Sequence, residues 1–462
     1  MFKAFITGTT KTAGIGAGNN AGIWSYAGTT GSLLAQTGVT HAPGTTDAIF
    51  AGLSDPAVQA DGSIAFTGGL KGGDVTKTPN NSTGVWLRKN GTTGLIVRQS
   101  GPAADVSNAT YKQFAQIVTQ DADDVAFLAT MAGKDLKASA NLGLWGADLS
   151  GALHSVIHTG QAITIGSAQR TVTAIHVFPT TTKEKGQSRS VDTLNGLLTF
   201  GLSFADKASA ICVATPTASG FDLESAAATW DTSVPGVANA KFAAFGNPAV
   251  NKNGASTSKT TKITAANGTG IWLDTGASTS LVARKGDQAA DGGGAVFATL
   301  EEPVLNNNDK VAFIGALLPA KNLATAATAA GIWSNTSGAF HLVARQGDTA
   351  AGVTGGKFSE FTQVVLPDAG GPIFLAKLIG VNTNVNTGIW CIGADGLTHL
   401  IGRTGDTLDV HGSSKVIKSL SIFTVCPQVV GQSRNFDAST RGMALSVTFS
   451  DGSWAIVQAV AP

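Results

Sequence analysis

The chain has 462 residues, of which 43% are hydrophobic and 13% are charged, and its formal net charge is +1. The hydrophobic content is too high for a disordered protein, and a charge this close to neutral provides neither a nucleic-acid-binding surface nor a basic patch for an anionic membrane. We therefore expect no nucleic-acid partner, and we expect no membrane insertion because no apolar run approaches the roughly 20 residues that span a bilayer.

The N-terminus, "MFKAFITGTTK", carries only a very short apolar stretch and does not have the form of a signal peptide. The 58 glycines that follow along the chain, together with abundant threonine, are typical of many short strands joined by tight turns.

A Gly-apolar-Trp triplet recurs along the chain at intervals of about sixty residues, which is the signature of a repeat architecture. A gap of 127 residues separates Trp145 from Trp272, and Ala210-Ile211-Cys212 fills it with cysteine in place of tryptophan. Trp230 is out of register. The tryptophans that we assign to the repeat, the last of them in a weaker Gly-Ser-Trp copy, are Trp24, Trp86, Trp145, Trp272, Trp333, Trp390 and Trp454.

Each unit is predicted to form four strands. In the unit 351–408 these are "FSEFTQVVL", "PIFLAKLIG", "GIWCIG" and "LTHLIGR", joined by short turns rich in Gly, Asn and Asp. A long glycine-rich connection follows the fourth strand. Such a crossing is what a β-propeller needs between blades, so we place the Phe-x-x-Phe strand innermost and the tryptophan strand third.

The fold is therefore predicted to be all-β, a single β-propeller domain over residues 1–462 whose ring is closed by the N- and C-terminal strands. Seven blades are favoured if the strand 32–37 completes the last blade, and eight result if the N-terminal strands form a blade of their own. The predicted divisions are half-units at 1–45 and 409–462 and complete units at 46–105, 106–165, 166–235, 236–290, 291–350 and 351–408.

The unit "GIW…LVARxGD…FxxF…P" resembles the tandem repeats of secreted bacterial proteins that often carry C-terminal sorting anchors. This resemblance implies an exported protein, extracellular or at the cell surface, of mostly unknown activity. The sequence departs from that pattern because it shows neither a signal peptide nor an anchor.

Three units carry an Arg-x-Gly-Asp turn, which makes Asp287, Asp348 and Asp406 candidate calcium ligands. Calcium takes six to eight oxygens, whereas each turn offers one carboxylate. The favoured interpretation is an aspartate that closes a glycine turn and pairs with its arginine. No cofactor is expected.

Two other groups of residues leave alternatives open. His154 and His158 have the spacing of helical zinc ligands, but in a strand they lie about 13 Å apart. Cys212, Cys391 and Cys426 form either one disulfide and a free thiol or three buried thiols.

Three functions compete. The favoured one is a non-enzymatic structural or interaction propeller in an extracellular or cell-surface assembly, which implies protein partners or self-association. The alternative is a propeller that binds a ligand, with a glycan as a candidate. The third is a hydrolase that uses residues of the irregular unit 180–235, including "TKEKGQSR" and Trp230.

Overall fold

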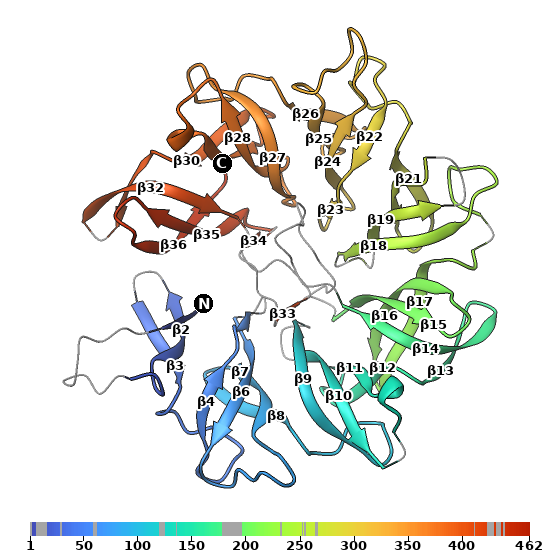
Figure 1. The fold of residues 1–462 in the computed structure, drawn as a ribbon, viewed down its shortest axis with the longest axis vertical. Coiled ribbons are helices and arrows are strands. Elements are labelled where there is room, and N and C mark those ends of the chain that lie inside the picture. The colour runs from blue at the N-terminus through green and yellow to red at the C-terminus, as the bar shows by residue number, and fades with distance from the viewer. Residues whose placement is uncertain are drawn as a thin grey trace. The chain divides into compact units, whose positions relative to one another are not determined.

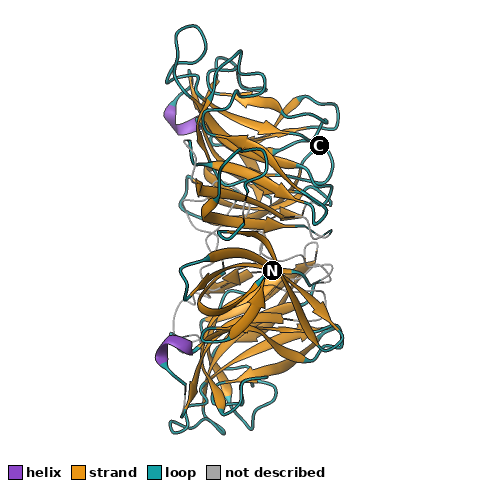
Figure 2. Ribbon diagram, turned by 90° about the vertical axis from the view of Figure 1, so that its right-hand side faces the viewer, coloured by secondary structure: helices purple, strands orange, loops and turns teal. Residues whose placement is uncertain are grey.

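The computed structural model contains strands and only two short helices in the residues that it describes, the 3-10 turns η1 (Ala138–Ala140) and η2 (Thr383–Val385) (Figure 2). Neither is long and apolar enough to cross a membrane. The described residues are 2–5, 16–27, 30–58, 62–119, 125–134, 136–177, 196–231, 233–251, 253, 256–263, 267–410, 412–422, 429–430, 436–437 and 439–462.

The chain divides into two compact units. Unit 1 comprises Met1–Pro179, Ser190–Ser225 and Cys426–Gly431, and unit 2 comprises Thr180–Arg189, Ala226–Val425 and Gln432–Pro462. Their strands form the blades of a β-propeller, and most of them are labelled in Figure 1.

Four sheets belong to unit 1, apart from the last three residues of β17. The first contains β1 (Phe2–Phe5), β2 (Ala21–Ala27) and β3 (Thr30–Gln36). The second contains β4 (Ile49–Leu53), β5 (Ala57–Val58), β6 (Ile64–Lys71), β7 (Thr83–Lys89) and β8 (Thr92–Arg98). The third contains β9 (Ala109–Thr119), β10 (Val125–Gly133), β11 (Leu142–Ala147), β12 (Leu153–His158) and the parallel strand β33 (Val429–Val430). The fourth contains β13 (Ala162–Ile165), β14 (Ala168–His176), β15 (Leu198–Phe204), β16 (Ser209–Thr217) and β17 (Gly220–Ala228).

Unit 2 holds the other four sheets. The fifth contains β18 (Phe242–Val250), β19 (Ser256–Ile263), β20 (Gly270–Asp274) and β21 (Thr279–Arg284). The sixth contains β22 (Phe297–Leu300), β23 (Val304–Leu305), β24 (Val311–Leu317), β25 (Ala330–Ser334) and β26 (His341–Arg345). The seventh contains β27 (Lys357–Val365), β28 (Ile373–Ile379), β29 (Thr387–Ile392) and β30 (Thr398–Arg403). The C-terminal sheet contains β31 (Thr407–Val410), β32 (Ser413–Ser421), β34 (Phe436–Asp437), β35 (Gly442–Phe449) and β36 (Trp454–Val460).

Strand order within the complete sheets follows chain order, as predicted. In the seventh sheet the Phe-x-x-Phe strand β27 pairs with β28, β28 with the tryptophan strand β29, and β29 with β30, all antiparallel. The connections between these strands span seven, seven and five residues, which is enough because antiparallel neighbours need only a short connection.

The sheet count corrects our preference for seven blades. The strands β1, β2 and β3 form a sheet of their own, and the C-terminal sheet contains no N-terminal strand, so the described residues form eight sheets. The predicted half-units each supply one sheet, because β1 pairs with β2 and β2 with β3 at the N-terminal end, and β32 pairs with β35 and β35 with β36 at the C-terminal end.

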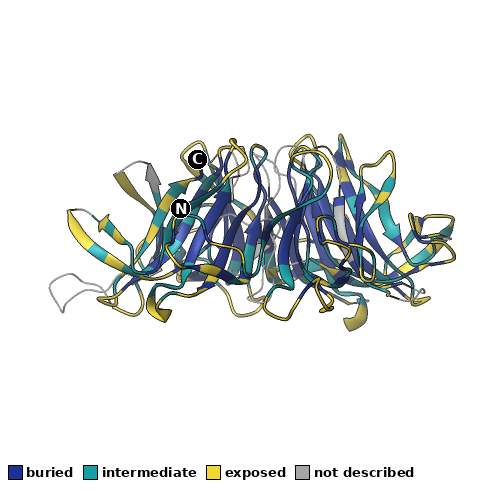
Figure 3. Ribbon diagram, turned by 90° about the horizontal axis from the view of Figure 1, so that it is seen from above, coloured by how far each residue is buried: buried dark blue, intermediate teal, exposed yellow. Residues whose placement is uncertain are grey.

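Hydrophobic clusters join successive sheets within each unit. In unit 1, Val85 and Leu87 of the second sheet pack with Phe127 and Trp145 of the third. In unit 2, a similar cluster joins Ile332 of the sixth sheet to Trp390 of the seventh. Figure 3 shows the buried residues concentrated in the strands and the exposed residues in the turns. The faces on which these sheets meet are therefore covered.

Candidate functional site

The Gly-x-Trp motif is explained by the indole ring, which folds back over the glycine two residues earlier. A Cβ atom on Gly84 would lie 2.8 Å from the ring of Trp86, and one on Gly143 would lie 2.5 Å from the ring of Trp145. Only glycine leaves room for such a ring. A β-bulge lies between the residue before the tryptophan and the tryptophan itself, for example between Val85 and Trp86.

Each of five tryptophans donates a hydrogen bond from Nε1 to a carbonyl in the connection that leads into its own sheet. The distances are 2.9 to 3.1 Å, and the acceptors are Pro43, Ala104, Pro235, Ala290 and Ala351 for Trp86, Trp145, Trp272, Trp333 and Trp390, respectively. These tryptophans are at most 3% exposed. They therefore build the blades and offer no surface to a ligand.

The acceptor is the middle residue of a tripeptide that sequence reasoning missed. A buried alanine or valine precedes it, as at Ala42 and Val234, and a residue with positive φ follows it. The third residue is Gly44, Asp105, Gly236, Asp291 or Gly352. Its φ lies between 57° and 78°, in the left-handed region that glycine and aspartate tolerate best. In the sequence this tripeptide reads Ala or Val, then Ala or Pro, then Gly or Asp, and it lies about forty residues before each of these five tryptophans.

The Arg-x-Gly-Asp segments form the turns that we predicted. In each, the aspartate N–H donates to the arginine carbonyl at 3.1 Å. The carboxylate of Asp287 accepts from the Arg284 guanidinium at 2.8 Å, whereas Asp348 and Asp406 accept from the backbone N–H of the arginine at 3.0 and 2.9 Å. These contacts give each carboxylate a role in the turn.

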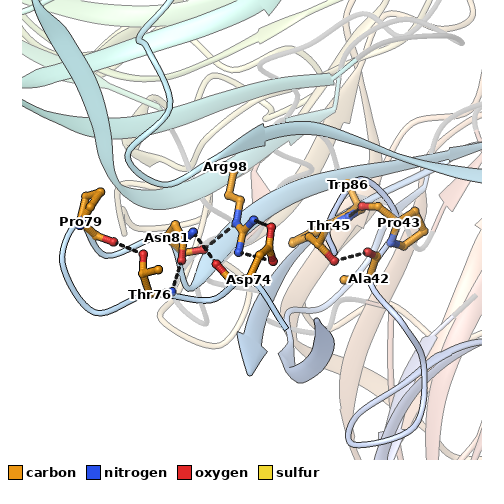
Figure 4. A network of polar contacts seen from close by, with 9 residues as sticks. All are labelled: Ala42, Pro43, Thr45, Asp74, Thr76, Pro79, Asn81, Trp86 and Arg98. Carbon is orange, nitrogen blue, oxygen red and sulfur yellow. Dashed lines mark hydrogen bonds and ion pairs between the residues drawn. The ribbon is translucent and has the colours of Figure 1, made fainter. Parts of the chain in front are cut away.

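The arginine that ends β8, in the second sheet, holds a loop. Arg98 donates to both oxygens of Asp74, at 2.7 and 3.2 Å, and to the carbonyl of Asn81 (Figure 4). The guanidinium lowers the pKa of Asp74. Figure 4 also shows Trp86 beside Pro43. The Arg98–Asp74 pair and the hydrogen bond of Trp86 therefore each secure one connection of the second sheet.

A histidine with two carboxylate partners is the most distinctive polar cluster of unit 1. His154 Nδ1 lies 2.9 Å from Asp105 Oδ2, and its Nε2 lies 3.2 Å from Asp148 Oδ2. Hydrogen bonds from Ser150 to the carboxylate lower the pKa of Asp148. Both ring nitrogens of His154 are engaged, so neither is placed to exchange a proton with a substrate. His158 contacts the Thr159 carbonyl instead of sharing a ligand with His154.

In unit 2, buried amides connect the ends of three successive sheets. Asn251 Nδ2 donates to the carbonyl of Asn306 at 2.9 Å, and Asn306 Nδ2 donates to the carbonyl of Pro367 at 2.8 Å. Asn307 adds two bonds to the carboxylate of Asp368. Sequence reasoning missed this chain because the residues lie 55 and 61 positions apart.

The thiols of Cys212 and Cys391 are free and buried, and burial raises the pKa of Cys212 to about 12. Cys212 lies opposite Phe200 as Trp145 lies opposite Phe127, which confirms that cysteine occupies the repeat position. Cys426 and residues 180–195 of the irregular unit 180–235, to which we assigned the hydrolase alternative, lie outside the described residues.

The assignment of Trp454 to the buried repeat is wrong. Trp454 is 61% exposed and begins β36, opposite Thr448. The repeat position in this sheet is Val457, which lies opposite Leu445. The physical reason is the turn before β36, which places Trp454 at the first position of the strand.

β36 carries a row of exposed apolar side chains. Ile456 is 45% exposed and Val460 is 60% exposed, and both point to the same side as Trp454 because side chains alternate along a strand. Three of the twelve large apolar side chains that are exposed among the described residues therefore lie on one strand of seven residues. This row, which we call the β36 apolar row, is the candidate functional site.

Comparison with known proteins identifies a repeated family. The family described as a family of unknown function (DUF7453) matches residues 2–218 and again residues 222–461. The comparison with curated proteins found no match.

Solved structures with similar folds share little sequence with this chain. They include an acylaminoacyl peptidase of Pyrococcus horikoshii (9% identity, TM-score 0.31, covering 88% of this chain and 52% of that one). A putative 6-phosphogluconolactonase of Bacteroides uniformis has 10% identity and a TM-score of 0.28, covering 83% of this chain and 93% of that one. A Trypanosoma rangeli sialidase has 10% identity and a TM-score of 0.26, covering 74% and 54%. The chain spans about half the length of the peptidase and of the sialidase. Likeness at this level identifies neither an activity nor a ligand.

Proposed function

Because this chain belongs to the family of unknown function DUF7453, of which it contains two copies, we propose its role from its own surfaces. We infer that it is a structural or interaction propeller without catalytic activity, and that it works as a subunit of a larger assembly. The observation that carries this proposal is the β36 apolar row, because exposed apolar side chains gathered on one element mark a surface that a partner covers.

The distinctive polar residues support the same role. The repeat tryptophans, the aspartates of the turns and the His154 cluster are each engaged in contacts that hold a connection or a hairpin in place. A contact that recurs in successive blades is typical of a structural role, since a catalytic site requires residues that occur in one blade only.

The charge of the chain also favours association. Its 31 basic and 30 acidic residues in 462 leave a net charge of +1. Electrostatic repulsion, which largely prevents soluble proteins from associating, is therefore weak between molecules of this chain. Interfaces between proteins are depleted in Lys, Glu and Asp, as this sequence is.

An extracellular or cell-surface location belongs to the proposal too. It is supported by the resemblance of the repeat to secreted bacterial proteins. Fractionation of the native source tests it, and recovery in the cytosol alone would refute the location without bearing on assembly.

Light scattering on the purified chain over a concentration series tests the assembly itself. We expect a mass above that of one chain that rises with concentration. A monomer at every concentration, with no partner in stoichiometric amount in the native particle, would contradict the proposal.

Glycan binding is a second candidate, favoured by one observation. The indole of Trp454 is 61% exposed, and an exposed aromatic face is a surface on which a sugar ring can stack. Titration with a panel of oligosaccharides, followed by tryptophan fluorescence in the wild type and in Trp454→Ala, separates the two functions. Saturable quenching that the variant loses would favour the glycan.

A further inference from the structure

Among the described residues, one edge of β36 has no strand paired with it. β35 is the strand that pairs with β36 among the described residues, and it lies on one side only. The Phe449 N–H donates to the Ser453 carbonyl, and the Ala461 N–H donates to the Arg441 carbonyl. In an antiparallel pair every second residue of a strand bonds to the neighbouring strand, so these two bonds determine which residues of β36 bond to β35. The N–H and C=O groups of Trp454, Ile456, Gln458 and Val460 then point away from β35.

The matching strand of the fourth sheet shows what a covered edge looks like. The hairpin β15–β16 has the same turn as β35–β36, with the Phe204 N–H bonded to the Ala208 carbonyl at 2.9 Å and the Phe449 N–H bonded to the Ser453 carbonyl at 2.8 Å. β16 pairs with β17 on its far side. Ile211 of β16 is 3% exposed, whereas Ile456 at the same position of β36 is 45% exposed.

β36 also lacks the usual protection of an edge strand. Natural edges are guarded by charged side chains that discourage pairing with another chain. The fourth strands β8, β21, β26 and β30 each end in arginine, whereas the seven residues of β36 are Trp-Ala-Ile-Val-Gln-Ala-Val and carry no charge. Its composition favours strand addition.

We propose that β36 pairs antiparallel with β36 of a second copy of this chain, around a two-fold axis at Val457. This inference rests on the proposed function, since it names the partner and the surface of the assembly. In that register Trp454 faces Val460 of the second copy, and Ile456 faces its Gln458. Each outward N–H and C=O group meets another outward group, and the apolar rows of both copies form one continuous surface.

A second copy fits this edge better than another protein for two reasons. The row is self-complementary, because Trp454 of each copy lies opposite the smaller apolar Val460 of the other, as a two-fold interface requires. The net charge of +1 on each chain gives two copies almost no electrostatic repulsion.

Two substitutions on the full chain test the pairing by light scattering and sedimentation. Gln458→Pro removes an outward N–H without removing a bond to β35, and proline is tolerated at such edge positions. Ile456→Lys places a charge in the apolar row. Leu397→Lys is the matched control, because Leu397 is 63% exposed in the turn of another sheet.

We expect a wild-type mass of two chains, and a dimer dissociation constant that rises by about tenfold or more in both β36 variants, which corresponds to about 1.4 kcal/mol. Leu397→Lys should leave the dissociation constant unchanged. Circular dichroism and the thermal midpoint show whether each variant is folded.

The outcomes distinguish the two proposals. A wild type that assembles while both folded β36 variants assemble equally well would overturn the β36 pairing and leave the assembly function standing. A mass that grows without limit would indicate head-to-tail association instead of a dimer and would also overturn the pairing. A wild type that is a monomer throughout would overturn the β36 pairing, and it would contradict the assembly function too if the native particle holds no partner in stoichiometric amount.

Discussion

The repeat tryptophan is engaged on several sides at once. Trp333 stacks on Phe313 at 6.0 Å between centroids, meets Phe297 edge-on at 4.9 Å, and donates to the Ala290 carbonyl. The sequence predicts that the ring is buried, because a large aromatic recurs in strand context. The carbonyl partner could not be predicted, because it lies 43 residues away in an irregular connection.

Trp333→Ala is predicted to destabilise the protein by about 3 to 5 kcal/mol, because it leaves a cavity in the core and an unpaired carbonyl. Leu397→Ala is the control and should change the free energy of unfolding by no more than about 0.5 kcal/mol, since Leu397 is 63% exposed and lies outside the β36 apolar row. Urea unfolding of the two variants measures both values. Equal losses would contradict the different environments of the two side chains.

Asp287, Asp348 and Asp406 are predicted to be turn residues and not metal ligands. Their oxygens already accept from the arginine of the same turn, so removal of divalent cations should leave the thermal midpoint unmoved. A bound ion would stabilise the native state by mass action. A midpoint that falls on addition of EDTA and recovers with excess calcium would show that the turns bind the ion.

At the scale of the element, the four-strand unit and its order follow from the alternation of strands and turns. The tripeptide that precedes five of the sheets was not predicted, because its third residue is determined by backbone conformation and not by hydrophobicity. The hairpins β13–β14 and β31–β32 were missed for a related reason: in these two units a short strand pair replaces the glycine-rich connection.

The third position of the tripeptide is predicted to require a left-handed backbone. Gly44 has φ of 78°, and a Cβ atom there would lie 2.7 Å from Cβ of Leu95. Gly44→Ala should therefore cost about 1 to 2 kcal/mol for the backbone alone, with the contact adding to it. Gly94→Ala in β8 is the control, because a Cβ atom there meets nothing within 4 Å. Denaturant midpoints compare them, and equal midpoints would refute the requirement.

At the scale of the whole molecule, the repeat establishes the propeller but leaves its ends ambiguous. The preference for seven blades assumed that strand 32–37 completes the last sheet, whereas β3 pairs with β2. Periodicity cannot decide this, since the same strand satisfies the pattern in either sheet. The β36 apolar row was not predicted for a similar reason. The Gly-Ser-Trp triplet resembles the buried repeat motif, but Trp454 lies three residues before Val457, which occupies the repeat position.

The stability of the molecule is predicted to fall in acid because several carboxylates have cationic or hydrogen-bonding partners. The pKa values of Asp74, Asp395 and Asp451 are lowered by Arg98, His399 and Lys415, respectively. A lowered pKa in the folded state stabilises the protein above the unfolded value of about 3.9, and this contribution is lost as the pH falls through the folded value. The thermal midpoint should thus vary little from pH 7 to 5 and drop below about pH 4. Asp74→Asn should lower the midpoint at pH 7 and flatten the drop, because its bidentate pair with Arg98 is already gone. Scanning calorimetry of both proteins from pH 7 to 2 measures this, and parallel curves would show that Asp74 contributes nothing to the pH dependence.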